Sequence, residues 1–248
     1  MAFTSDTSHA KNVTNFNSLI SAVLTIGQDY KPSKDSIKLP ALQSLLTAAN
    51  NSLADLNSAK SANSTAIDQR ELAFKPLGSL FTRVNNALKA SNSSVQADET
   101  AKTIFRKLQG KRASAKLTNE EKAALEAEGK EVNQISASQM GYDERVDNFE
   151  KLISLLQSIP EYKPNEVELK VETLQAVLAD LKTKNAEVMK TYFVLETARG
   201  VRNDLLYKEL TGIVDISVDV KAYIKSIYGA TSTQYKLVSI LRFAKIKS

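Results

Sequence analysis

The feature that most constrains the fold of this 248-residue chain is a series of matches between its two halves. Residues 15–21 and 148–154 agree at five of seven positions, and Tyr30-Lys31-Pro32 recurs as Tyr162-Lys163-Pro164. Further matches follow in the same order: Leu42-Gln43 with Leu174-Gln175, Ala66 and Arg70 with Ala198 and Arg202, and Leu88-Lys89 with Ile224-Lys225. The offset stays between 132 and 136 residues. Such order at a near-constant offset predicts a tandem duplication.

Apolar residues in each half recur in steps of three and four, which is the spacing of one buried helix face. Glycine and proline are scarce, at 8 and 5 residues, so the turns of a hairpin-rich β-fold are not available. The spacing predicts helices near residues 12–28, 37–74 and 77–90, and again near 137–159, 166–200 and 203–227, with a short fourth helix closing each half. We therefore expect an all-α fold, an elongated helical bundle built from a tandem duplication of a roughly four-helix unit.

The predicted boundaries follow from polar breaks and capping patterns. Residues 1–109 form the first helical repeat, residues 110–136 a linker with a short acidic helix, and residues 137–248 the second repeat. Ser93 with Gln96 three residues later has capping-box spacing and predicts the start of the fourth helix. The sequence leaves open whether the two repeats pack together or lie side by side.

Several classes of chemistry lack the residues they need. The chain has no cysteine and one histidine, His9, so thiolate sites, disulfides and two-histidine metal sites are excluded. No glycine-rich phosphate loop or nucleophile elbow occurs. We therefore expect no enzymatic activity, no catalytic residue, no metal, no cofactor and no small-molecule substrate. The polar N-terminus and the lack of a long apolar stretch predict a soluble, cytoplasmic protein without a transmembrane segment.

Positive charge is concentrated in two stretches, although the net charge is only +5. Residues 102–116 and residues 220–248 each carry six Lys or Arg and no Asp or Glu. Cations at the end of a helix complement its dipole, which is one explanation. The alternative is a pair of repeat-related sites for an anionic partner, with these candidate residues: Arg106, Lys107, Lys111, Arg112, Arg242, Lys245 and Lys247.

Four segments carry a resemblance to a known group of proteins. They are the repeated Asn-Phe-x-x-Leu-Ile-Ser with Tyr-Lys-Pro, Arg-Lys-Leu-Gln-Gly-Lys-Arg-Ala at 106–113, Gln-Ile-Ser-Ala-Ser-Gln at 134–139, and Tyr-Ile-Lys-Ser-Ile-Tyr-Gly-Ala-Thr-Ser at 223–232. Over most of its length the chain resembles an uncharacterised group of bacterial all-helical proteins. The resemblance implies a bacterial origin and a helical fold, and no activity or functional residue.

Two functions fit these features. The first is a non-enzymatic structural or scaffolding protein that self-assembles, as a homo-oligomer or filament, when basic helix ends of one copy meet the acidic body of another. The second is an accessory protein that binds a polyanion, such as nucleic acid, an anionic surface or an acidic protein, through the two basic patches.

Overall fold

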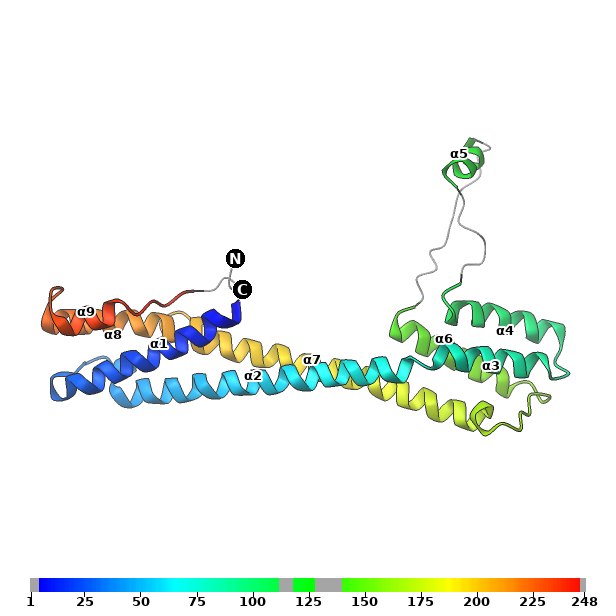
Figure 1. The fold of residues 1–248 in the computed structure, drawn as a ribbon, viewed down its shortest axis with the longest axis horizontal. Helices are drawn as coiled ribbons and strands as arrows, with labels where there is room; N and C mark the ends of the chain where they lie inside the picture. Colours follow the sequence, from blue (N-terminus) through cyan, green and yellow to red (C-terminus); the bar gives the residue numbers. More distant parts are fainter. Residues whose placement is uncertain (1–4, 112–117, 128–139, 246–248) are drawn as a thin grey trace. The chain divides into compact units, whose positions relative to one another are not determined.

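A computed structural model describes residues 5–111, 118–127 and 140–245 (Figure 1). The fold is all-α, with no strand among these residues, as the sequence predicts. The elements, with η for short 3₁₀ helices, are α1 Ser5–Ile26, η1 Gly27–Asp29, η2 Asp35–Ile37, α2 Leu39–Phe74, α3 Leu77–Lys89, α4 Val95–Leu108, α5 Asn119–Ala127, α6 Tyr142–Gln157, η3 Val167–Leu169, α7 Val171–Tyr207, α8 Ile213–Tyr228 and α9 Thr233–Ser239. The described chain divides into two compact units.

The first unit consists of residues 1–64 and 191–248, so it combines the two ends of the chain. In it α1 packs against α8 and α9, beside the first part of α2 and the last part of α7 (Figure 1). Its core contains Phe16 and Leu19 of α1 together with Ile213 and Val220 of α8, all fully buried. Burial of these side chains stabilises the unit because apolar surface leaves water.

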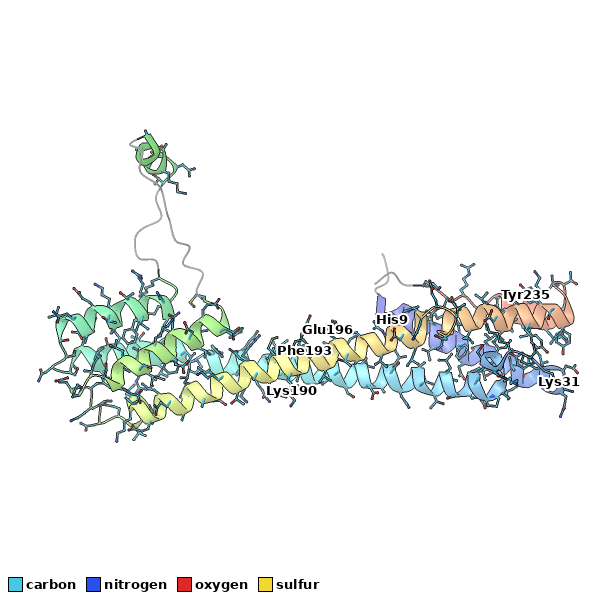
Figure 2. All side chains as sticks on the ribbon, turned by 180° about the vertical axis from the view of Figure 1, so that it is seen from behind. His9, Lys31, Lys190, Phe193, Glu196 and Tyr235 are labelled. Carbon is cyan, nitrogen blue, oxygen red and sulfur yellow. The ribbon has the colours of Figure 1, made fainter. Side chains whose placement is uncertain are left out.

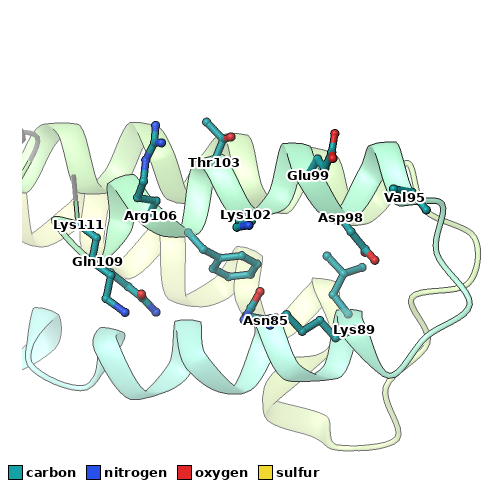
Figure 3. A pocket seen from close by; sticks show the side chains of 12 residues that line it. Asn85, Lys89, Val95, Asp98, Glu99, Lys102, Thr103, Arg106, Gln109 and Lys111 are labelled. Atoms are coloured by element: carbon teal, nitrogen blue, oxygen red, sulfur yellow. The ribbon is translucent and has the colours of Figure 1, made fainter. Parts of the chain in front are cut away.

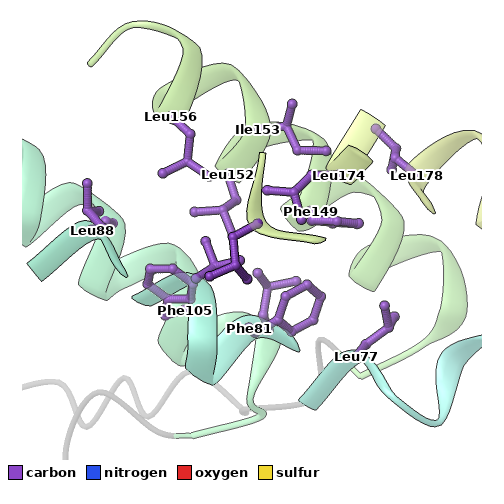
Figure 4. Packing of buried hydrophobic residues seen from close by; sticks show 14 of the residues in the cluster. Leu77, Phe81, Leu88, Phe105, Phe149, Leu152, Ile153, Leu156, Leu174 and Leu178 are labelled. Atoms are coloured by element: carbon purple, nitrogen blue, oxygen red, sulfur yellow. The ribbon is translucent and has the colours of Figure 1, made fainter. Parts of the chain in front are cut away.

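The second unit consists of residues 65–190. Here α4 packs against both α3 and α6, and η3 lies against α3. Phe81 of α3 and Phe149 of α6 meet edge to face with ring centres 5.1 Å apart, and Phe105 of α4 joins the same cluster (Figure 4). A change of the fully buried Phe149 to alanine should cost about 3–5 kcal/mol, because the burial of the ring is lost and a cavity is left.

Each compact unit therefore takes helices from both predicted repeats. The helices that open residues 1–109 pack with the helices that close residues 137–248, and the reverse holds in the second unit. Helices α2 and α7 run unbroken for 36 and 37 residues and contribute to both units. Residues 39–64 and 191–207 belong to the first unit, and residues 65–74 and 171–190 belong to the second.

Corresponding features recur at the offsets seen in the sequence. Each buried position of α6 matches a buried position of α1 shifted by 133, although α1 also buries His9 and Asn12. The matched residues are Val13, Asn15, Phe16, Leu19, Ile20 and Val23 with Val146, Asn148, Phe149, Leu152, Ile153 and Leu156. Elements η2 and η3 are 132 residues apart, as are the first residues of α2 and α7. The Tyr30 hydroxyl donates to the Ile37 carbonyl at 2.7 Å, and the Tyr162 hydroxyl donates to the Leu169 carbonyl at 2.8 Å.

Some predicted boundaries were wrong. The helix predicted at 203–227 is two helices, because α7 continues to Tyr207 and α8 begins at Ile213. Between them Leu210 adopts a positive φ of 64°, held by a 3.0 Å hydrogen bond from its N–H to the Asp215 carboxylate. Ser94, and not Ser93, caps α4: its hydroxyl accepts from the Ala97 N–H at 3.2 Å. In the predicted linker, α5 is described, whereas residues 112–117 and 128–139 lie outside the described residues.

Candidate functional site

One predicted basic residue near the C-terminus, Lys245, is engaged within the chain, as is Lys221 of α8. Lys245 forms a 2.9 Å ion pair with Asp215 at the start of α8. The bonded ammonium, together with the Leu210 N–H, lowers the pKa of the Asp215 carboxyl. Lys221 of α8 donates to the Leu241 carbonyl and lies over the Phe243 ring, 5.0 Å from its centre. These cations therefore fasten the C-terminal segment to α8.

Two buried asparagines of α1 hold the same segment, residues 240–245. Asn12 donates to the Ala244 carbonyl at 2.9 Å and accepts from the Ala244 N–H at 3.1 Å. Asn15 donates to the Arg242 carbonyl at 2.6 Å, so Arg242 contributes its backbone while its side chain is exposed. The segment is thus part of the packing of the first unit. Lys247 lies outside the described residues.

Two of the predicted basic residues, Arg106 and Lys111, line a groove between α3 and α4 (Figure 3). The groove has a volume of about 850 Å³, and its cationic lining is Lys89, Lys102, Arg106 and Lys111. Arg106 and Lys111 lie at one end, whereas the carboxylates of Asp98 and Glu99 lie toward the other (Figure 3).

The cations near the end of α4 differ in their ion pairs from the cations near the C-terminus. Within the described residues, none of the groove's four cations takes part in an ion pair. Arg106 and Lys107 occupy the last turn of α4, where positive charge also favours the helix dipole. Lys107 does not line the groove, and Arg112 lies outside the described residues. The two predicted basic patches therefore differ within the described residues: Arg106 and Lys111 line a groove without ion pairs, whereas Lys245 is paired with Asp215 and the Arg242 side chain is exposed.

The buried polar residues of the first unit support packing. His9 Nδ1 lies 2.6 Å from the Tyr207 hydroxyl oxygen, with the two rings 5.5 Å apart. Burial raises the pKa of Tyr207.

Among the described residues no group of three or more His, Asp or Glu side chains is placed to hold a metal ion. In the same part of the chain, no helix is long and apolar enough to cross a membrane.

An apolar groove that the sequence analysis did not find lies between α2 and α7 in the first unit. It has a volume of about 370 Å³, and α7 supplies most of its lining: Phe193, Val194, Thr197, Ala198 and Val201, with Ser52 and Asp55 from α2. The side chains of Phe193, Val194 and Val201 are 62%, 54% and 50% exposed. Figure 2 shows Phe193 between Lys190 and Glu196 along this helix.

The exposure of these residues has a local cause. Between α2 and α7 the buried cluster here is small, formed by Leu56, Ala59 and Leu195 with Ala198 at its edge. Two helices bury only the stripes that face each other, so apolar residues elsewhere on α7 stay in contact with water. The run Tyr192-Phe193-Val194-Leu195 was a usable signal, because four successive bulky residues cannot all lie on one face of a helix.

Comparison of the chain with protein families, with curated proteins and with solved structures found no match. The resemblance to a bacterial group of helical proteins therefore remains a prediction.

Proposed function

We propose that this protein is a non-enzymatic structural or scaffolding protein that acts by associating with other copies of itself. The observation that carries the proposal is the apolar groove between α2 and α7, with Phe193, Val194 and Val201 at least half exposed. Contiguous exposed apolar surface on a folded chain is typical of a protein–protein contact. Its burial against another chain contributes about 25 cal/mol for each Å² removed from water.

This contact differs from the one that the charge pattern alone predicts. A basic end that meets an acidic body needs free cations. In the first unit Lys245 is already paired with Asp215, so Arg242 is the one predicted cation of the described C-terminal segment that makes no ion pair. An apolar contact makes no such demand and depends little on salt, whereas association through exposed charges weakens as salt screens them. Salt dependence therefore separates the two versions of self-assembly.

The test is sedimentation velocity of the intact chain at low and high salt. We expect association that persists in high salt and that is lost in the double variant Val194→Ser/Val201→Ser. The matched control is Val218→Ser, which removes an equally exposed valine from α8. A monomer under all conditions would overturn the proposal. Association that disappears in high salt would favour the basic ends over the groove.

A second candidate function, polyanion binding, is favoured by one observation in the second unit. Lys89, Lys102, Arg106 and Lys111 line a single groove without ion pairs among the described residues. Retention on heparin should then fall steeply with salt, and Arg106→Ala/Lys111→Ala should elute earlier than the control Lys163→Ala. Equal elution of both variants would remove this candidate.

A further inference from the structure

A stripe of exposed residues on α7 has a charge at each end and an apolar centre. Lys190, Val194, Thr197, Val201 and Asp204 follow one another in steps of four, three, four and three. This is the heptad spacing that keeps side chains on one side of a helix. All five residues are exposed, so nothing in the described chain covers the stripe.

We propose that this stripe, called here the α7 stripe, is the surface through which two copies pair, with their α7 helices antiparallel across a two-fold axis at Thr197. The inference rests on the proposed function and specifies its partner and geometry. In an antiparallel pair, positions at equal distances on opposite sides of the axis lie level with each other. Lys190 of one copy then lies level with Asp204 of the other, and this contact occurs twice because the interface is isologous.

The charge pattern selects this direction. A parallel pair in register would place Lys190 beside Lys190 and Asp204 beside Asp204, which repel, whereas the antiparallel pair places opposite charges together. Asp204 makes no ion pair among the described residues. Lys190 has only an exposed contact of 3.3 Å with Glu187, and such a surface pair is easily exchanged.

The shapes of the central residues fit the same arrangement. With the axis at Thr197, Phe193 of one copy lies level with Val201 of the other, and Val194 lies level with Gly200. A Cβ placed on Gly200 would meet no atom within 4 Å, so the space above this glycine is open in the single chain. Gly200 lies beside the stripe, next to Val201, and its missing side chain leaves room for a second helix to approach this side of α7.

Reversal of the charges provides the decisive experiment, using the full chain and sedimentation equilibrium. Lys190→Glu alone and Asp204→Lys alone should each weaken dimerisation about tenfold, because two attractive contacts become repulsive. The double variant Lys190→Glu/Asp204→Lys should recover the wild-type affinity. A mixture of the two single variants should form heterodimers in preference to either homodimer. Lys163→Glu, an exposed change of the same charge, is the control.

Cysteine cross-linking tests the position of the two-fold axis. Because the sequence contains no cysteine, an introduced cysteine can form a disulfide only with its counterpart in another copy. Thr197→Cys should form a disulfide-linked dimer under mild oxidation, whereas Ser61→Cys, an exposed site on α2, should remain monomeric. If the wild type never dimerises, the proposed function fails together with this inference. If it dimerises but neither the charge reversal nor Thr197→Cys responds, self-assembly stands and pairing through the α7 stripe is wrong.

Discussion

Tyr30 and Tyr162 show how single side chains fix the turn that precedes each long helix. Each hydroxyl donates to a carbonyl seven residues later, Ile37 or Leu169, in the 3₁₀ helix before α2 or α7. Burial raises the pKa of both phenols, to about 12 for Tyr162. Their matched places in the two sequence halves predict packing anchors, and these hydrogen bonds agree with that role.

The raised pKa of Tyr162 predicts a loss of stability at alkaline pH. The neutral phenol is favoured in the folded chain, so its contribution is complete below pH 10, the usual pKa of tyrosine, and is lost as the pH rises toward 12. Tyr162→Phe should lower the free energy of unfolding at pH 7 by about 0.5–1.5 kcal/mol and flatten its decline above pH 10. Urea denaturation at several pH values measures both effects. An unchanged alkaline profile in Tyr162→Phe would contradict this explanation.

At the scale of elements, periodicity was sufficient for the helices and insufficient for their ends. The apolar spacing predicts α2, α3 and α7 well, because each buries one continuous stripe. The break at residues 208–212 was missed because Leu210, a residue that rarely adopts positive φ, turns the chain there with the help of Asp215. The hydrogen bonds from Asn12 and Asn15 to the backbone of residues 240–245 leave no periodic pattern in the sequence. The only sign of them is that both asparagines are polar residues next to the buried Val13 and Phe16.

The surface of α7 could not be predicted from the sequence either. Runs of charge are visible in a sequence, whereas the exposure of an apolar helix face depends on what packs against it. Residues such as Val194 and Val201 have the composition of a core, and only the packing of α2 on α7 shows that they are outside it. The basic residues near the C-terminus illustrate the opposite case. Lys245 was a candidate for an external partner, and the structure pairs it with Asp215.

Gly200 gives a prediction at the same scale. A glycine inside a helix costs about 1 kcal/mol relative to a good helix former, and the space beside Gly200 is open in the single chain. Gly200→Gln should therefore raise the thermal midpoint of the monomer while it weakens dimerisation, because the new side chain occupies open space at the edge of the α7 stripe, where the second helix approaches. Calorimetry and light scattering of the same sample test both parts. A variant that is more stable and still dimerises fully would argue against pairing at this site.

At the scale of the whole molecule, the repeats visible in the sequence are not the compact units. Each unit joins the opening helices of one predicted repeat to the closing helices of the other. Sequence matches between the halves do not show which copy of a helix is the packing partner. The duplication itself stays a prediction, supported by the matched hydrogen bonds of Tyr30 and Tyr162.

The packing across repeats predicts how fragments behave. Residues 1–109 alone lack α8, whose Ile213 and Val220 complete the core around Phe16. This fragment should therefore show weak, non-cooperative thermal melting by circular dichroism. When it is refolded with residues 110–248, helicity and a cooperative transition should return. Cooperative melting of the isolated fragment would mean that a repeat folds by itself.

If unmodified chains associate through an apolar surface, their average mass in solution rises with protein concentration even when salt screens their charges. Sedimentation equilibrium of the wild type in high salt should show the average mass rising from 27.2 kDa toward twice that value as the protein concentration increases. A mass that stays at 27.2 kDa over the whole concentration range would contradict the claim.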